Sequence, residues 1–164
     1  MRQIVLVAHN VRSAHNVGSL LRTADGLGVD KIYLTGYTPY PAMKNDERLP
    51  HIASKIHRQI QKTALGAEKS VNWQPYKELL ELIRTLKAEG FEVVALEQTK
   101  GAISLTEFKP KKDIALFVGS EIGGLDKKIL EEADACVEIP MRGKKESFNV
   151  AIAAAITLYH LRHM

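Results

Sequence analysis

The chain has 164 residues, of which 45% are hydrophobic and 26% are charged, with 23 Lys and Arg against 19 Asp and Glu. This length suits one domain, this composition excludes a disordered or fibrous chain, and a charge of +4 alone is weak evidence for a nucleic-acid partner. The single cysteine, Cys136, excludes an internal disulfide framework and, because it lies in a predicted strand, indicates an inert core thiol. The sequence shows no secretory signal and no apolar run of the roughly 18 residues that span a membrane, so we expect a cytoplasmic protein.

Short β-branched runs alternate with helical patterns along the chain. The predicted strands are nearly unbroken apolar runs, typical of strands covered on both faces, and lie at 4–8, 31–35, 71–73, 92–96, 114–119 and 136–139. The predicted helices lie at 17–27, 52–64, 76–88, 126–132 and 147–163, and Gly90 is expected to end the third of them in a left-handed conformation. This alternation predicts an α/β fold, with a mostly parallel sheet and helices on both of its faces.

Basic residues are concentrated in the first third of the chain. Residues 1–62 hold nine Lys and Arg against four Asp and Glu, whereas residues 63–164 hold fourteen against fifteen. The irregular stretch 36–50 lies in the basic part, and a loop of that length is often functional. A solvated helix face is the simpler explanation of such a cluster, and contact with phosphates is the more specific one.

Several common sites are absent from the sequence. Gly26 and Gly28 come at the end of a helix and lack the third glycine of a dinucleotide-binding turn. Gly143 has no partner glycine five residues earlier, which excludes a Walker A loop. No zinc pattern is present, so we expect no metal site, and the spacing of His160 and His163 near the chain end favours a solvated pair.

Three segments carry a more specific signal, and the first begins at Asn16. We interpret Asn16 as the N-cap of a helix, and Arg22 then points about 120° away from it around an ideal helix, close enough for its long side chain to turn toward the sheet edge. A capped surface helix with a solvated arginine is the alternative.

The other two segments follow predicted strands. After residue 118 an apolar strand breaks into a loop with three glycines around one carboxylate, Glu121, and ligands bind at that end of strands in open α/β sheets. A glycine-rich turn into the next helix is the alternative. After Pro140 a basic loop leads to a helix that begins near Ser147 and is apolar almost all round. Such a helix is buried on more than one side, so we expect one side to face its own sheet and the other to face a second subunit.

Together and in this order, the three segments resemble the SpoU (TrmH) family of RNA ribose 2′-O-methyltransferases in the SPOUT superfamily. The matching signatures are Asn-x-Gly-x-x-x-Arg at 16–22, Gly-x-Glu-x-x-Gly-Leu at 119–125, and Ile-Pro-Met with Ser-x-Asn-Val between 139 and 150. Phe148 departs from the leucine that the family usually has, which is a conservative change. The resemblance spans essentially the whole chain.

The resemblance implies one domain, 1–164, with a deep trefoil knot within about 92–164, although knots are nearly absent from proteins. It implies S-adenosylmethionine as cofactor, bound by Leu96, Glu97, Gly119, Glu121, Ile139, Met141, Ser147 and Phe148. It implies methyl transfer to a ribose 2′-hydroxyl, with catalytic residues Asn16, Arg22, Glu121, Ser147 and Asn149. For Arg22 we favour holding an RNA phosphate and stabilising the developing alkoxide over a role as general base, because a guanidinium group stays protonated in proteins.

The implied partner is RNA, and the compact chain favours tRNA. The candidate RNA contacts are Arg12, Tyr37, Tyr40, Lys44, Arg48, Lys55 and Arg58. The resemblance also implies a homodimer, formed through the C-terminal helix 147–163 and the region of the first motif, that shares the site between subunits. The alternatives are an rRNA substrate, a catalytically silent RNA-binding SPOUT domain, and an unrelated α/β enzyme acting on a small nucleotide.

Overall fold

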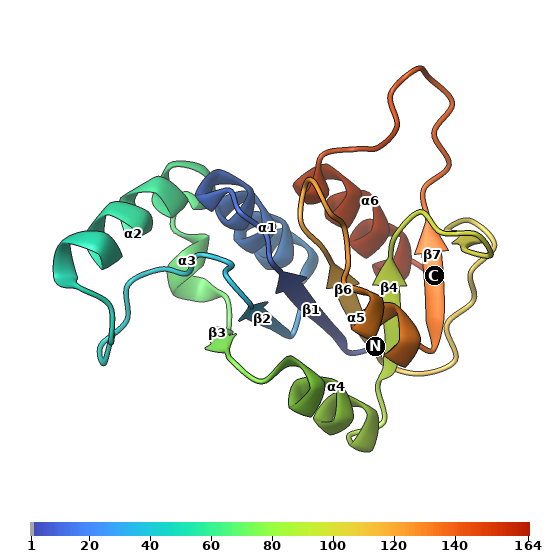
Figure 1. The fold of residues 1–164 in the computed structure, drawn as a ribbon, viewed down its shortest axis with the longest axis horizontal. Helices are drawn as coiled ribbons and strands as arrows, with labels where there is room; N and C mark the ends of the chain where they lie inside the picture. The colour runs from blue at the N-terminus through green and yellow to red at the C-terminus, as the bar shows by residue number, and fades with distance from the viewer. Residues whose placement is uncertain (1) are drawn as a thin grey trace.

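Parallel strands form one seven-stranded sheet in the computed structural model, which describes residues 2–164 (Figure 1). The order across the sheet is β3-β2-β1-β6-β4-β7-β5, and every neighbouring pair is parallel. The strands are β1 (Ile4–His9), β2 (Lys31–Thr35), β3 (Trp73–Tyr76), β4 (Glu92–Leu96), β5 (Ile103–Ser104), β6 (Ile114–Val118) and β7 (Ala135–Glu138). Because all strands run the same way, their carboxyl ends meet at one edge of the sheet.

Helices cover both faces of the sheet, as the apolar runs predicted. They are α1 (Ala14–Leu27), α2 (Pro50–Ala64), α3 (Ala67–Ser70), α4 (Leu79–Ala88), α5 (Lys127–Glu132) and α6 (Val150–Arg162). Alternate residues of β1 point to opposite faces: Leu6 packs in the core cluster of α1, α2, α3 and α6, and Val7 in that of α4 and α5. None of the described helices is long and apolar enough to cross a membrane.

The first and last helices, α1 and α6, begin at other residues than predicted, for the same physical reason. Helix α1 is capped by Ser13, whose Oγ accepts a hydrogen bond from the Asn16 amide at 3.2 Å, so the prediction of Asn16 as N-cap is wrong. Helix α6 begins three residues later than predicted, because Asn149 is its cap and accepts from the Ala151 amide at 2.9 Å. Several consecutive polar residues at each start can cap a helix, and only the tertiary contacts select one of them.

Smaller differences concern the edges of the sheet. Strand β3 lies two to three residues later than predicted, because its pairing with β2 continues to Tyr76, opposite Thr35. Helix α4 accordingly begins at Leu79, three residues later than predicted. It tolerates Pro75 because it is an edge strand. The two-residue strand β5 and the one-turn helix α3 were not predicted, since elements that short carry no periodic pattern. Gly90 has a φ of 92°, which confirms the left-handed end after α4.

Cys136 and His160 have surroundings that differ from those predicted. Cys136 is half-buried on β7 and its thiol hydrogen-bonds to Thr99 and to the Glu97 carbonyl, so it is not fully in the core. His160 is not solvated: its Nε2 is buried and has no hydrogen-bond partner within residues 2–164. His163 is exposed and packs against Tyr159, with ring centroids 4.4 Å apart.

Helices α1 and α2 cross at Gly18, which belongs to the first motif. A Cβ at this position would overlap Thr63 Oγ1 and the Ile60 carbonyl oxygen of α2. The same hydroxyl donates to the His15 carbonyl of α1 at 2.7 Å, which ties the two helices together at the crossing. The glycine of the motif is therefore required for close approach of the two helices.

We expect Gly18→Ala to lower the free energy of unfolding by about 1–3 kcal/mol, because the added methyl group forces the helices apart. Gly26→Ala is a matched control in the same helix, since a Cβ there meets nothing within 4 Å. This control is expected to keep or raise stability by about 0.5–1 kcal/mol. Urea unfolding of both variants measures the difference, and equal stabilities would contradict the assigned contact.

Candidate functional site

A cavity of about 320 Å³ opens at the carboxyl ends of β4, β6 and β7. All of the predicted cofactor residues except Met141 line it: Leu96, Glu97, Gly119, Glu121, Ile139, Ser147 and Phe148. The sequence interpretation missed further lining residues beside the same motifs, namely Gln98, Val118, Ser120, Ile122, Gly123, Gly124, Glu138, Glu146, Val150 and Ala153. The structure thus brings three loops, far apart in sequence, around one space.

The loop 119–125 is closed on itself by backbone contacts. The amides and carbonyls of Ser120 and Gly124 bond to each other at 3.0 Å in both directions, and the Gly123 amide donates to Ser120 Oγ at 2.9 Å. A Cβ at Gly119 would overlap the carbonyl group of Gly124. A Cβ at Gly124, where φ is 66°, would overlap the carboxylate of Glu97. Close backbone approach therefore requires the glycine at 119, and a left-handed φ beside the Glu97 carboxylate requires the glycine at 124.

Glu121 joins this loop to the start of α1. Its carboxylate accepts hydrogen bonds from the Arg12 amide at 3.0 Å, the Ser13 amide at 3.3 Å and Asn16 Nδ2 at 2.7 Å. Burial alone would raise the pKa of Glu121. The hydrogen bonds from α1 outweigh burial and hold this pKa below its usual value, so Glu121 is an anion at neutral pH.

Asn16 connects Glu121 to the third motif. Its Nδ2 donates to Glu121, and its Oδ1 accepts from Asn149 Nδ2 at 3.2 Å. Asn149 in turn caps α6. One polar chain, Glu121–Asn16–Asn149, therefore links the three motifs at the rim of the cavity, although 105 and 133 residues of sequence separate its partners.

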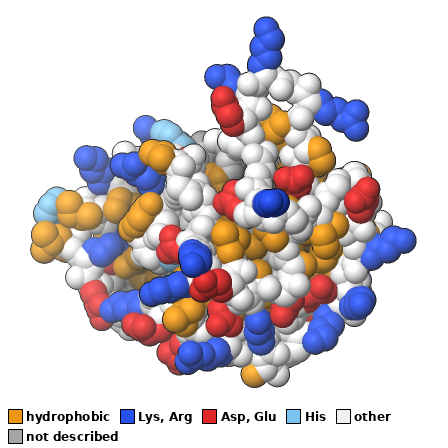
Figure 2. Space-filling view, turned by 45° about the vertical axis from the view of Figure 1, so that its right-hand side comes forward, with side chains coloured by type: hydrophobic (Ala, Val, Ile, Leu, Met, Phe, Trp, Pro, Cys, Tyr) orange, Lys and Arg blue, Asp and Glu red, His pale blue; other side chains and the backbone are white. Residues whose placement is uncertain are grey.

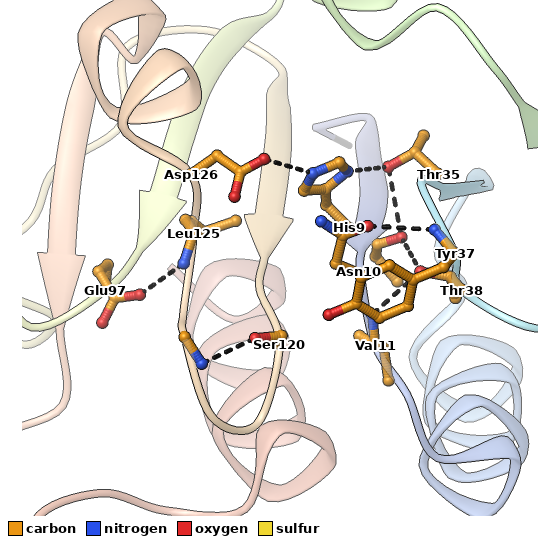
Figure 3. A network of polar contacts seen from close by, with 12 residues as sticks. His9, Asn10, Val11, Thr35, Tyr37, Thr38, Glu97, Ser120, Leu125 and Asp126 are labelled. Atoms are coloured by element: carbon orange, nitrogen blue, oxygen red, sulfur yellow. Dashed lines mark hydrogen bonds and ion pairs between the residues drawn. The ribbon is translucent and has the colours of Figure 1, made fainter.

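A second set of contacts fixes the far end of the loop to the sheet (Figure 3). His9 is buried, with 7% of its side chain exposed, and lies between two partners, Asp126 Oδ2 at 3.0 Å from Nε2 and Thr35 Oγ1 at 2.9 Å from Nδ1. The Leu125 amide donates to Glu97 Oε2 at 2.9 Å. The loop is thus attached to β1, to β2 and to the end of β4. No sequence pattern singled out His9, because its partners are 26 and 117 residues away.

Arg22 lies outside the cavity of its own chain. It is exposed on α1, and nothing in the chain from residue 2 onward forms a hydrogen bond or ion pair with it. Asn16 and Asn149 stand at the rim, where Asn16 contacts the lining residue Glu121 and Asn149 contacts Asn16. The structure therefore assembles the predicted polar residues with the exception of the arginine.

The predicted RNA contacts divide into exposed and engaged side chains. Arg48 is engaged: it pairs with Asp46 (Nε to Oδ1, 2.8 Å), its guanidinium lies 3.7 Å from the Tyr40 ring centroid, and its side chain is 17% exposed. The guanidinium holds the pKa of Asp46 well below its usual range. Arg48 and Tyr40 therefore stabilise the loop 36–50. The exposed members of the set are Arg12, Tyr37, Lys44, Lys55 and Arg58.

Known proteins resemble this chain over nearly its whole length. The chain is 32% identical to the 23S rRNA (guanosine(2553)-2′-O)-methyltransferase RlmP of Bacillus subtilis, over 96% of this chain and 57% of the relative. It is 29% identical to the tRNA (guanosine(18)-2′-O)-methyltransferase of Aquifex aeolicus, over 96% of this chain and 68% of the relative. The chain therefore spans between half and three quarters of the length of these relatives.

The same resemblance extends to the fold. The crystal structure of the AdoMet-bound rRNA methyltransferase from Sinorhizobium meliloti matches with a TM-score of 0.80 and 26% identity, over 99% of this chain and 57% of that one. The sequence model described as "SpoU rRNA Methylase family" matches residues 3–159, which include all three motifs. The chain belongs to the SpoU rRNA methylase family.

Proposed function

We propose that this chain transfers a methyl group from S-adenosylmethionine to a ribose 2′-hydroxyl of RNA. The observation that carries the proposal is the polar chain Glu121–Asn16–Asn149, which joins the three motifs at the rim of a glycine-walled cavity. The names of the relatives, which act on rRNA and tRNA, support it. The cavity also lies at the carboxyl edge of a parallel sheet, where α/β proteins bind their ligands.

The chemistry of the cavity fits the cofactor. Four glutamates line it, Glu97, Glu121, Glu138 and Glu146, and no Lys, Arg or His of the described chain does. Such a lining favours a cationic ligand, and S-adenosylmethionine carries a sulfonium and an ammonium group. The same glutamate lining disfavours ligands that carry phosphates, which supports a methyltransferase over an enzyme that acts on small nucleotides. The apolar side chains of Leu96, Ile139 and Phe148 suit an adenine ring, and the volume suits a small molecule.

We expect S-adenosylhomocysteine and S-adenosylmethionine to bind the chain in a one-to-one ratio per subunit, and ATP and NAD not to bind, because four carboxylates repel phosphate groups. Isothermal titration calorimetry measures all four ligands under one set of conditions. Binding of ATP or NAD with no binding of the sulfur-containing ligands would overturn the methyltransferase proposal.

The residues of the chain position the acceptor. Bound S-adenosylmethionine supplies an electrophilic methyl group. Glu121 accepts hydrogen bonds from the Arg12 amide, just before α1, and from the side chain of Asn16. These bonds fix the position of the first motif relative to the cavity. Ser147 lines the cavity next to the cap of α6, where its hydroxyl can orient the ribose. Arg22 holds an RNA phosphate and stabilises the negative charge that develops on the 2′-oxygen.

Arg22 reaches this position from a second subunit. The outer face of α6 carries Ile152, Ile156 and Tyr159, which are 52%, 38% and 60% exposed and share one side of the helix. Helix α6 packs beside α1, so a homodimer through this face brings the first motif of one subunit toward the cavity of the other.

The C-terminal half forms the cofactor-binding unit, with a trefoil knot within about residues 92–164. Every residue that lines the cavity lies between Leu96 and Ala153, which supports this boundary. Family membership and the convergence of the loops after β4, β6 and β7 on one space support the knot.

The RNA substrate is tRNA, with rRNA as the second candidate. The tRNA (guanosine(18)-2′-O)-methyltransferases among the relatives support tRNA, and the rRNA enzyme of Bacillus subtilis supports rRNA. The cytoplasm holds both substrates. Labelled S-adenosylmethionine, purified protein, and tRNA and rRNA fractions from a strain that lacks the gene provide the test, followed by mapping of the modified ribose. Cofactor binding without transfer to either fraction would instead indicate a silent RNA-binding domain.

A further inference from the structure

The loop between β7 and α6 projects away from the carboxyl edge of the sheet (Figure 1). Its residues 142–149 are exposed, and its tip carries three cations, Arg142, Lys144 and Lys145, followed by Glu146. In the space-filling view, Lys and Arg side chains extend in different directions from this projection (Figure 2). We refer to residues 140–146 as the basic loop.

The cations of the basic loop have no role inside the chain. No ion pair or side-chain hydrogen bond joins Arg142, Lys144 or Lys145 to any of residues 2–164. Arg48 is the contrast, since its guanidinium is held by Asp46 and Tyr40. Three unpaired cations on one exposed loop repel one another, which is unfavourable unless an anionic partner binds there.

The position of the basic loop relates these cations to the cavity. Ile139, directly before the loop, and Ser147, directly after it, both line the cavity, whereas the three cations do not. The loop therefore rises from the rim. The cavity below is lined by glutamates, which suits a cationic cofactor but repels an approaching polyanion. The three cations therefore lie beside the cavity without forming part of its lining.

We propose that the basic loop binds the phosphates that flank the target ribose in the RNA substrate. The inference rests on the proposed function. A ribose whose 2′-hydroxyl enters the cavity has a phosphate on each side, and these must lie at the rim. The loop cations neutralise these phosphates and offset repulsion by the glutamates, and they contact the backbone without reading its sequence.

The test compares two triple variants of the full chain that remove the same charge. One is Arg142→Ala, Lys144→Ala and Lys145→Ala. The control is Lys109→Ala, Lys111→Ala and Lys112→Ala, three lysines that precede β6 and so lie at the opposite, amino edge of the sheet. RNA affinity is measured for both at several salt concentrations, with the RNA fraction that accepts the methyl group, and S-adenosylhomocysteine affinity is measured by calorimetry.

The loop variant is expected to lose about two units of the slope of log affinity against log salt, at about 0.7–0.9 per phosphate contact. Its KM for RNA rises about tenfold or more while its affinity for S-adenosylhomocysteine stays unchanged. The control keeps the wild-type slope. Arg142→Lys with both lysines retained keeps the charge and should behave as the wild type, which separates the effect of charge from a change of loop shape.

Three outcomes overturn the proposal. Equal slopes for the loop variant and the control would show that the loop does not contact phosphates. Loss of cofactor binding in the loop variant would show that the loop shapes the cavity instead. A wild-type protein that transfers methyl groups with an RNA affinity independent of salt would also exclude the assigned contacts. By contrast, a wild-type protein that transfers no methyl group to any RNA defeats the proposed function itself.

Discussion

Arg22→Ala is expected to reduce methyl transfer by about 10²- to 10³-fold, while the affinity for S-adenosylhomocysteine stays unchanged. The rate falls because the guanidinium no longer stabilises charge on the 2′-oxygen. Cofactor affinity is unaffected because the contacts assigned to Arg22 are with the RNA phosphate and the 2′-oxygen and not with the cofactor, whose cavity is lined by other residues. Single-turnover methyl transfer and calorimetry measure the two quantities separately.

Arg84→Ala is the matched control for Arg22→Ala, because Arg84 is an exposed arginine on α4, on the opposite face of the sheet. It should transfer methyl groups at the wild-type rate. Arg22→Lys keeps the charge but loses the planar pair of donors, and should recover only part of the rate. Loss of cofactor binding in Arg22→Ala would show that the assigned role is wrong.

A mixing experiment tests whether Arg22 acts across the dimer. If it does, a mixed dimer of an Arg22→Ala subunit and a Glu121→Gln subunit contains one complete site, formed by the cavity of the first and the arginine of the second. Co-refolding of the two inactive variants should then restore a measurable part of the activity. If Arg22 serves its own cavity, the mixture remains as inactive as the two parents.

Glu121→Gln is expected to have the second-largest effect. The carboxylate accepts three hydrogen bonds from the start of α1, and an amide places an NH₂ group against at least one of those donors. The first motif should shift relative to the cavity, and a misplacement of about 1 Å can reduce a rate by about 10²-fold. The free energy of unfolding at neutral pH should fall by about 1 kcal/mol, a low value because Glu121 is partly exposed to solvent.

The stability difference between wild type and Glu121→Gln should depend on pH in a defined direction. The folded-state pKa of Glu121 lies below the ordinary glutamate value of 4.5, so its stabilising contribution is complete above that value and is lost as the pH falls through the folded pKa. Urea unfolding between pH 7 and pH 3 measures it. The gap between the two proteins should narrow below about pH 4.5, and a gap that widens with acid would contradict the hydrogen-bond assignment.

The central strands and most of the site could be predicted from sequence because the relevant signals are local. Strand β1 is buried on both faces over its whole length, and its apolar run shows this directly. Gly119 is needed because the backbone crosses itself at Gly124, five residues later, and the two glycines appear together in one motif. The ends of α1 and α6 were less predictable, because two or more polar residues at each end can act as the cap.

The RNA contacts show where sequence reasoning was misled. Counting charge by segments drew attention to residues 1–62 and to Arg48, whose charge is in fact neutralised by Asp46 two residues earlier. The same counting gave residues 63–164 a balance near zero, because the cations of the basic loop were averaged with glutamates that line the cavity. The loop was recognised as basic in the sequence, but its cations were not among the predicted RNA contacts. An RNA-binding surface depends on where charged side chains lie in space, and the net charge of a segment does not show this.

The sequence by itself determined the α/β architecture, through periodic burial, and the three motifs, whose resemblance to a known family implied seven of the residues that line the cavity. Only the tertiary structure decided which side chains act together. The bond of Asn16 to Glu121, the burial of His9 against Asp126, and the exposure of Arg22 depend on segments about a hundred residues apart or on the packing of whole helices. A hydrogen bond requires atoms within about 3 Å, and a sequence does not specify distances between distant segments until the sheet brings their ends to one edge.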